Sequence, residues 1–480
     1  KIATNLAMKS NVTVNCQNGA IVDFNASSDS TVISFTGTVG SEYAFAAAAT
    51  TGDTTVTLSG SPSFAENDLV HFVSVRNSLS RTDAGTWWLG DGTADAPYAY
   101  YGEFNYIAED LGSGQYRLAK PFLFPGYEVN ASGETETNRT TSAAQLVTPC
   151  KNAHWIGGTI VRDQIGANLI TGTWAVNCSV KNCEIIRGNI KGNTLVWAAS
   201  FQCEGKNILH HNDPSLNFVY ANDHGDYNRF KTIGSQDCGF IGLNESYGGQ
   251  SVDFTYGSSG LLFCNVRSYC RDGLFSHCFE ELTSHPGCYQ ESFVNNEIVD
   301  CYTDGINVRG YEPIITGNII TSTNQATAGT EDVTIGIALA YGATRRAFVS
   351  GNTVRGFFYA FRILGSTTLE WYWENCLINI CNNEVSECFV GLYSTLSTAS
   401  ENNFLRFITY NNNNHSFMGR FVVDLDEYNA GVTITNNTMN GGFRYTGTGS
   451  FVAFIHAANN CPALIVKDNV WLRTKGSNST

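Results

Sequence analysis

A four-residue phrase recurs through the second half of the chain, and it constrains the fold more than any other feature. The phrase is a small polar residue, Asn, any residue and an apolar residue. Successive copies are roughly 20 to 35 residues apart in most cases, which is the period of a stacked repeat architecture. The copies are Asn295-Asn296-Glu297-Ile298, Gly317-Asn318-Ile319-Ile320, Gly351-Asn352-Thr353-Val354, Asn382-Asn383-Glu384-Val385, Asn436-Asn437-Thr438-Met439 and Asp468-Asn469-Val470-Trp471, with a looser copy around Asn182.

The residues around each copy alternate as the residues of a strand do. Phe293-Val294 precede the first copy, Ile298-Val299 follow it, and a second strand is expected after an Asp304-Gly305 turn. One coil is therefore expected to hold two strands joined by a turn, and a longer loop of variable length. Asn suits the bend, because it tolerates left-handed backbone angles and because stacked Asn side chains can hydrogen bond between coils. The pattern predicts an all-β fold, a parallel β-helix. The alternatives, a β-propeller or a large sandwich, need two-residue hairpin turns at a shorter period.

The repeat is interrupted near the N-terminus. Residues 1–40 alternate like the first coils of a β-helix, and residues 146–480 carry the main β-helix. Residues 41–145 break the period and contain their own strand patterns, such as Asn67–Val73, beside a segment rich in Trp and Tyr. A small β-domain inserted into the β-helix is therefore expected there.

Composition excludes several classes of function. The net charge is −15 and no Lys/Arg-rich run occurs, so nucleic-acid binding is not expected. There is no apolar run of 18 residues, hence no predicted membrane span. The 15 cysteines lack zinc-site spacing, and we expect reduced, buried thiols. No cofactor is indicated. The chain opens on Lys1 without a Met or a leader pattern, so flanking segments are expected.

Two stretches carry a family resemblance. Asn11–Phe24 resembles the opening of pectin-lyase-like right-handed parallel β-helices. The insertion, with Asn67–Val70, Gly102–Phe104 and Leu118–Phe122, resembles that of bacteriophage tailspikes, which are also similar in their Asn-rich coils and unpaired cysteines. The resemblance implies a homotrimer on the virion tail, folded in the host cytoplasm and attached to the baseplate or tail by a segment outside this chain. It also implies binding and cleavage of a bacterial surface polysaccharide, either capsule or O-antigen.

Tailspikes share no catalytic motif, so the site is predicted from residues alone. Aligning Gly273 with Gly305 stacks Asn307 over Phe275 and Arg309 over His277 on the outer face, with Asp253 one coil earlier. The predicted catalytic residues are Asp226, Asp253, His277, Glu280, Glu281 and Arg309, and the predicted substrate-binding residues are His224, Tyr227, Tyr247, Tyr256, Asn307 and Tyr311, with Trp87 and Trp88 as further aromatic candidates.

Hydrolysis of a glycosidic bond needs two carboxyl groups, and Asp253 with Glu280 or Glu281 is the preferred pair. A lyase needs a base and a cation instead, which His277 and Arg309 would supply. Hydrolysis is favoured because carboxylates are plentiful and Lys is scarce in the middle coils. A lyase, a non-catalytic adhesin and a secreted polysaccharide lyase with paired cysteines remain open.

Structural roles compete with each of these assignments. Asp272 and Asp304 precede Gly and are expected to form turns. The set of His224, Asp226 and His277 does not have the spacing of a metal site, so no metal is predicted.

Overall fold

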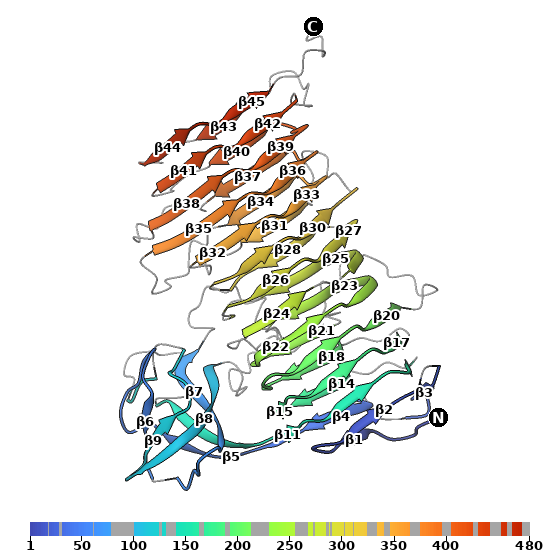
Figure 1. The fold of residues 1–480 in the computed structure, drawn as a ribbon, viewed down its shortest axis with the longest axis vertical. Helices are drawn as coiled ribbons and strands as arrows, with labels where there is room; N and C mark the ends of the chain where they lie inside the picture. The colour runs from blue at the N-terminus through green and yellow to red at the C-terminus, as the bar shows by residue number, and fades with distance from the viewer. Residues whose placement is uncertain are drawn as a thin grey trace. The chain divides into compact units, whose positions relative to one another are not determined.

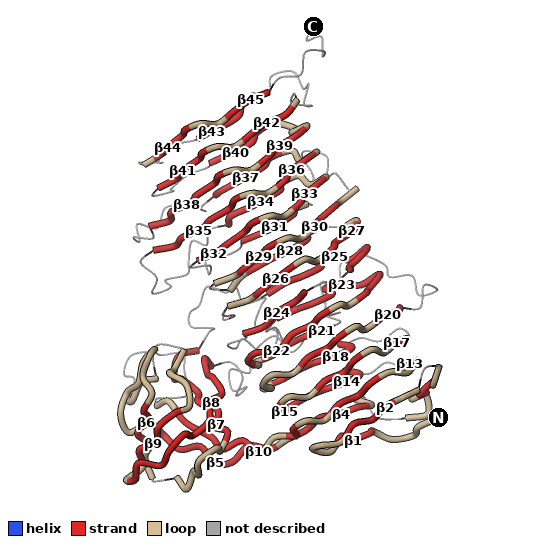
Figure 2. Tube along the Cα trace, in the orientation of Figure 1, coloured by secondary structure: helices blue, strands red, loops and turns tan. Residues whose placement is uncertain are grey.

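The computed structural model describes residues 1–17, 19–27, 31–60, 62–77, 100–123, 127–130, 141–162, 168–187, 193–212, 230–254, 267–271, 274–284, 288, 290–301, 303–310, 312–323, 334–339, 346–364, 375–395, 405–425, 431–441, 453–457 and 463–472. These residues form strands and loops (Figure 2), and none of them forms a helix long and apolar enough to cross a membrane.

The chain forms two compact units, described separately below. Unit 1 comprises Lys1–Ile241, Asp253–Ser268 and His285–Cys288, and unit 2 comprises Gly242–Val252, Tyr269–Ser284 and Tyr289–Thr480.

Unit 1 contains parallel β-helix coils and an antiparallel sheet. The coil strands are β1 (Leu6–Met8), β2 (Thr13–Asn15), β3 (Ile21–Asp23), β4 (Ile33–Thr36), β11 (Cys150–Lys151), β12 (His154–Ile156), β13 (Thr159–Arg162), β14 (Asn168–Thr173), β15 (Ala175–Val176), β16 (Ser179–Lys181), β17 (Glu184–Arg187), β18 (Asn193–Ala198), β19 (Glu204–Lys206), β20 (Leu209–Asn212), β21 (Phe230–Ile233) and β22 (Gln236–Ile241). The strands of residues 1–40 pair in parallel with later coils: β2 with β12, β3 with β13 and β4 with β14.

The antiparallel sheet of unit 1 has the strand order β5-β10-β7-β8-β9-β6. Its strands are β5 (Thr38–Ala44), β6 (Thr55–Thr57), β7 (Leu69–Asn77), β8 (Tyr100–Gly112), β9 (Gln115–Leu118) and β10 (Ala143–Thr148). Phe104 on this sheet packs with Trp174 and Phe201 of the coils, and the Phe104 amide donates a 2.7 Å hydrogen bond to the Gln236 side chain. An apolar cluster and a buried hydrogen bond thus hold the antiparallel sheet against the coils of unit 1.

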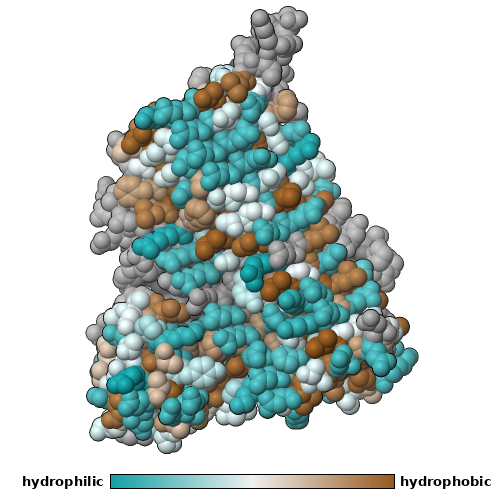
Figure 3. Space-filling view, viewed as in Figure 1, coloured by the Kyte–Doolittle hydropathy of each residue, from teal (hydrophilic) through white to brown (hydrophobic). Residues whose placement is uncertain are grey.

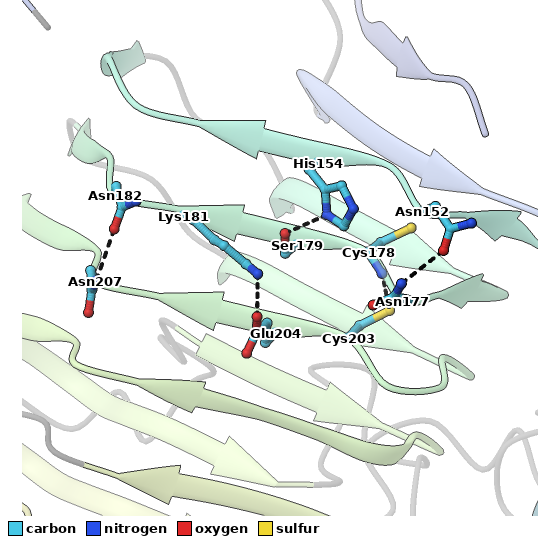
Figure 4. Close-up of polar contacts among 10 residues, drawn as sticks. All are labelled: Asn152, His154, Asn177, Cys178, Ser179, Lys181, Asn182, Cys203, Glu204 and Asn207. Carbon is cyan, nitrogen blue, oxygen red and sulfur yellow. Dashed lines mark hydrogen bonds and ion pairs between the residues drawn. The ribbon is translucent and has the colours of Figure 1, made fainter. Parts of the chain in front are cut away.

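Exposed asparagines connect the coils of unit 1 (Figure 4). The Asn177 amide donates to Asn152 at 2.8 Å, and the Asn207 amide donates to Asn182 at 2.9 Å. All four residues have positive φ, between 50° and 53°. The position therefore requires a residue that tolerates the left-handed backbone conformation, as Asn does.

Cysteines fill the interior beside these turns. The amide of Cys178 donates to Cys203 Sγ at 3.4 Å, and that of Cys203 to Cys238 Sγ at 3.2 Å. Twelve cysteines have described side chains; all twelve have free thiols, and all except Cys16 are buried. Burial raises the pKa of Cys183 to about 12, so this thiol is protonated at neutral pH.

Unit 2 consists of successive coils, which Figure 1 shows as the rungs from β24 to β45. Ladder 1 is formed by β24 (Arg267–Arg271), β26 (Ser292–Val294), β29 (Ile314–Thr316), β32 (Arg346–Ser350), β35 (Asn375–Cys381), β38 (Leu405–Asn411), β41 (Gly431–Thr435) and β44 (Leu464–Lys467). Ladder 2 is formed by β27 (Glu297–Val299), β30 (Ile319–Thr321), β33 (Thr353–Arg355), β36 (Glu384–Ser386), β39 (Asn414–Ser416), β42 (Thr438–Asn440) and β45 (Val470–Leu472).

Ladder 3 of unit 2 is formed by β28 (Asp304–Val308), β31 (Ile335–Leu339), β34 (Tyr359–Leu364), β37 (Val390–Thr395), β40 (Phe421–Leu425) and β43 (Ala453–Ala457). The long strand β25 (Leu274–Ser284) pairs with β27 through its first residues and with β28 through its last. Strand β23 (Asn244–Phe254) lies mainly in unit 2. The ladders of unit 2 are parallel, which excludes the propeller and sandwich alternatives.

Two details of the predicted coil are wrong. A full coil has three strands, because the Asn turn separates ladder 1 from ladder 2 and a second bend precedes ladder 3. Asp304 and Gly305 do not form a turn, since both lie within β28.

The recurrent Asn forms a buried ladder in unit 2, as predicted. Asn383 shows the pattern: its Oδ1 accepts from the backbone amide and the Nδ2 of Asn352, while its Nδ2 donates to Val349 O and Asn413 Oδ1. The same bonds link Asn296, Asn318, Asn352, Asn383, Asn413, Asn437 and Asn469. The residue before each ladder Asn has the positive φ, for example 56° at Asn382.

The outer face of ladder 1 mixes apolar and polar side chains. Ile314, Phe348, Leu377 and Phe407 are 39–48% exposed. They are interspersed with polar residues such as Thr409, and in Figure 3 hydrophobic side chains accordingly occur in small groups between hydrophilic ones.

Replacing Asn383 by Ala should lower the free energy of unfolding of unit 2 by about 3 kcal/mol or more. The change leaves the amide of Asn352 and the carbonyl of Val349 buried without these partners, and each such group costs about 1–3 kcal/mol. Urea unfolding compared with the wild type measures the effect. The control is Glu384→Ala, an exposed residue next in the chain, for which a change within about 0.5 kcal/mol is expected. Equal losses in both variants would contradict the structural role of the ladder.

Buried His415 should make unit 2 sensitive to acid. Its Nδ1 donates to Thr438 O at 3.2 Å and its Nε2 accepts from the Tyr410 hydroxyl at 2.6 Å. Burial lowers the pKa of His415 from 6.5 to about 4. The stabilising contribution is therefore complete above about pH 6.5 and is lost as the pH falls towards 4, by about 3 kcal/mol in total.

Urea unfolding at several pH values tests this expectation. His415→Gln should flatten the dependence between pH 6.5 and 4, whereas Asn414→Gln, at the exposed and non-ionisable neighbouring position, should leave it in place. An unchanged slope in His415→Gln would show that other groups cause the acid loss.

Candidate functional site

Most predicted site residues lie where the structure gives no side-chain position. Asp226, His224, Tyr227, Tyr256, Tyr311, Trp87 and Trp88 lie outside the described residues. The backbones of Asp253 and Tyr247 on β23, and of His277, Glu280 and Glu281 on β25, are described, but their side chains are not. Only Asn307 and Arg309 have described side chains. The catalytic assignments therefore stay predictions.

The predicted stacking of these residues is wrong. Phe275 is buried and pairs with Ile298 on β27, not with Asn307. Asn307 pairs with Thr283, and Asp304 pairs with Glu280. The error arises because β25 bends across two ladders, so a fixed step between Gly273 and Gly305 joined different parts of the coil. Arg309 is 4% exposed, with its amide donating to Ser284 Oγ, and so is not the outward cation that was expected.

Ladder 3 instead aligns one column of residues in unit 2, which is buried at its first three members and partly exposed at its last four. In register order it contains Thr283, Asn307, Ala338, Arg362, Tyr393, Asp424 and His456. Buried neighbours flank its members on their own strands: Phe361 and Ile363 enclose Arg362, and Val423 and Leu425 enclose Asp424. Alternation in a strand turns the middle side chain away from the core. We call this set the ladder 3 column.

A parallel pair of tyrosines lies at the centre of this face. The rings of Tyr359 and Tyr393 are 4.6 Å apart with an interplanar angle of 10°. The Arg362 guanidinium carbon lies 5.4 Å from the Tyr359 ring centre and 5.9 Å from that of Tyr393. Cation–π attraction to both rings therefore holds the guanidinium in place.

An imidazole–carboxylate pair lies further along the column. His456 Nδ1 is 2.7 Å from Asp424 Oδ1, and the His456 ring stacks on Phe421 at 5.1 Å and 14°. The guanidinium carbon of Arg420 lies 4.6 Å from the Phe421 ring centre. Two arginines, three aromatic rings and one carboxylate–imidazole pair thus share one face of unit 2.

The pKa of the Tyr359 phenol is shifted by the burial and the charges of this face. Burial, the largest cause, and the neighbouring Tyr393 and Asp424 raise its pKa to about 12, against the opposing effects of Arg362 and Arg420. A phenol with this pKa remains protonated at neutral pH and is a hydrogen-bond donor rather than a base.

The arrangement is suited to binding a carbohydrate. Aromatic faces pack against the apolar faces of sugar rings, while guanidinium and carboxylate groups bind hydroxyl or acidic substituents. No group of three His, Cys, Asp or Glu side chains able to hold a metal occurs in the described part of the chain.

Sequence reasoning missed this cluster, although a signal for it exists. Arg362 and Tyr393 each follow their ladder Asn, Asn352 and Asn383, by ten residues, and Asp424 follows Asn413 by eleven. Counting from the Asn turn rather than from glycines would have aligned them.

Comparison with known proteins identifies the fold. No protein-family model matches the chain, and no curated protein matches its sequence. The tailspike gp61 of Pseudomonas phage phi297 matches with a TM-score of 0.58 and 12% identity, over 92% of this chain and 68% of that chain. The Gp54 tailspike of Acinetobacter baumannii bacteriophage AP22 matches with a TM-score of 0.56 and 11% identity, over 87% of this chain and 70% of that chain. The tailspike gp49 of Pseudomonas phage LKA1 matches with a TM-score of 0.54 and 13% identity, over 95% of this chain and 72% of that chain.

The chain has the parallel β-helix fold of phage tailspikes. The fold class inferred from the Asn repeat is thereby confirmed. At 11–13% identity the likeness assigns no residue a role, so the ladder 3 column has to be argued from its own chemistry.

The shifted ionisation of Tyr359 can be measured directly. The ultraviolet absorbance of tyrosinate after a rapid pH jump should differ between the wild type and Tyr359→Phe only near pH 12, the pKa given above. Tyr43→Phe, at a partly exposed tyrosine of unit 1, is the matched comparison. A Tyr359 difference that appears already near pH 10 would show that the phenol is solvated and the stack open.

Proposed function

We propose that this protein binds a bacterial surface polysaccharide, capsule or O-antigen, and cleaves it internally by hydrolysis. The observation that carries the proposal is the Tyr359–Tyr393 stack with Arg362 on the outer face of ladder 3. The fold likeness supports it, because the AP22 tailspike was solved in complex with A. baumannii capsular saccharide. We propose the same setting for this chain, as a homotrimer on a phage virion tail.

A polymer needs an extended binding face, and the later coils of ladder 3 supply one. Coils are about 4.8 Å apart, so the partly exposed part of the column, from Arg362 to His456, spans about 14 Å. Aromatic and charged side chains occur along it rather than at one point. This repetition favours a polysaccharide over a small ligand.

Two carboxyl groups at one end of ladder 3 fit the hydrolytic chemistry. Glu280 and Asp304 occupy paired positions on adjacent strands of unit 2, so their Cα atoms are about 4.8 Å apart. Retaining glycosidases use carboxyls about 5 to 5.5 Å apart. The Asn307 amide donates to Asp304 Oδ2 at 2.9 Å, which fixes the orientation of that carboxylate.

In this mechanism one carboxyl protonates the glycosidic oxygen as the bond to C1 breaks, and the other attacks C1. Water then releases the sugar and returns the proton. We assign the acid to Glu280 and the nucleophile to Asp304. Glu281 is the alternative to Glu280. The sequence-based partner Asp253 belongs to unit 1, which makes the pair within unit 2 the simpler proposal.

A lyase has less support. It needs a base beside the acidic sugar, and Tyr359, next to Arg362, has a pKa raised to about 12, which disfavours loss of its proton. Arg309, the cation first assigned to this role, is buried.

Incubation with a panel of bacterial capsules and lipopolysaccharides tests the proposal. We expect new reducing ends without the ultraviolet absorbance of an unsaturated uronate. Glu280→Gln and Asp304→Asn should each lower kcat by about 100-fold or more with KM little changed. Glu384→Gln, an exposed residue of ladder 2, is the control and should keep full activity.

Three other results would contradict the proposal. An unsaturated product would identify a lyase, and binding without either signal would identify an adhesin. Full activity in both Glu280→Gln and Asp304→Asn would place the catalytic carboxyls outside this pair, with Asp253→Asn as the next variant.

A further inference from the structure

Arg362 is a cation without an acidic partner in the described part of unit 2. Its contacts there are the two tyrosine rings, and its Nε is buried without a hydrogen-bond partner among the described residues. Two other arginines of this unit have an acidic partner: Arg355 pairs with Glu387 at 3.1 Å, and Arg346 lies 4.0 Å from Glu312. A half-buried cation lacking a counter-charge has a place for an anion.

The nearest carboxylate in the column does not fill that place. Asp424 lies two coils away from Arg362, about 10 Å along the ladder. Its Oδ1 is already engaged by His456 at 2.7 Å. Among the described residues of the ladder 3 column Asp424 is the one acidic side chain, and the imidazole thus keeps it occupied and reduces repulsion of an incoming anion.

The tyrosine stack sets the geometry of this position. Contact with both rings restricts the movement of the guanidinium before any ligand arrives, so less side-chain entropy is lost on binding. A guanidinium fixed in this way suits a planar carboxylate, which it can bind through two parallel hydrogen bonds. The protein as a whole carries a net charge of −15, so such a ligand needs a local cation of this kind.

We infer that Arg362 is a specificity residue that binds the carboxylate of an acidic sugar, such as a hexuronate, within the polysaccharide. Tyr359 and Tyr393 act as positioning residues that hold the guanidinium. Arg420, on the adjoining Phe421 ring, places a second cation two coils further along the same face. The inference rests on the proposed function for the polymeric nature of the ligand, but it does not depend on cleavage.

The test compares each acidic capsule of the panel with its carboxyl-reduced form, in which every uronate is converted to the neutral hexose and the linkages remain. The wild type should bind the native polymer about 10- to 100-fold more tightly than the reduced one. Arg362→Gln should lose the same factor on the native polymer and should no longer distinguish the two forms. Arg362→Lys should retain part of the preference, because it keeps the charge without the planar fork.

The control variant is Arg355→Gln, which removes an arginine from ladder 2, and it should leave the preference unchanged. Thermal unfolding of Arg362→Gln beside the wild type shows whether the coil is intact. Added salt should weaken the native complex more than the reduced one.

Failure of the inference is distinguishable from failure of the proposed function. Equal binding of native and reduced polymers, or binding of neutral polymers only, overturns the role of Arg362 and leaves polysaccharide binding standing. If no polymer binds, the proposed function fails, and sodium glucuronate is titrated against glucose instead. If the wild type binds glucuronate and Arg362→Gln does not, the result supports an acidic-sugar site at Arg362. If the wild type does not bind glucuronate, the acidic-sugar site is overturned.

Discussion

The buried Asn ladder is the interaction on which unit 2 depends. Each coil must bend sharply between ladder 1 and ladder 2, and the bend leaves backbone amides and carbonyls that face the interior. The Asn side chain satisfies them with all four of its hydrogen-bonding positions, as Asn383 does. A buried polar group is tolerated only when it is satisfied in this way. The ladder also aligns successive coils, because each Asn bonds to the next.

Unit 1 solves the same bend with different chemistry. Its turns keep a left-handed Asn, such as Asn182 and Asn207, but these side chains are exposed. The interior position next to them holds Cys183 or Ile208. An apolar residue there packs with its neighbours without requiring an unbroken line of partners. Polar satisfaction in unit 2 and apolar packing in unit 1 therefore lead to the same parallel coil.

Stacking also explains how the ladder 3 column arises. Once the Asn turns fix the register, residues ten or eleven positions later lie one above another, although the chain between coils varies in length. Arg362, Tyr393 and Asp424 come from strands about thirty residues apart in the sequence. A β-helix converts such periodic positions into an extended outer face about 4.8 Å per step, and neighbouring side chains can then orient each other as the tyrosines orient Arg362.

The sequence by itself determined the class of fold, because a polar residue at a fixed bend and a period-two pattern around it are local properties that repeat. It also determined the identity of the ladder residues and the burial of cysteines such as Cys203. Only the tertiary structure decided that a coil has three strands, that Asp304 lies inside one, and that Arg309 is buried while Arg362 is half-exposed beside two stacked rings. Those properties depend on the register between coils, and β25 shows that one bend across two ladders changes every pairing after it.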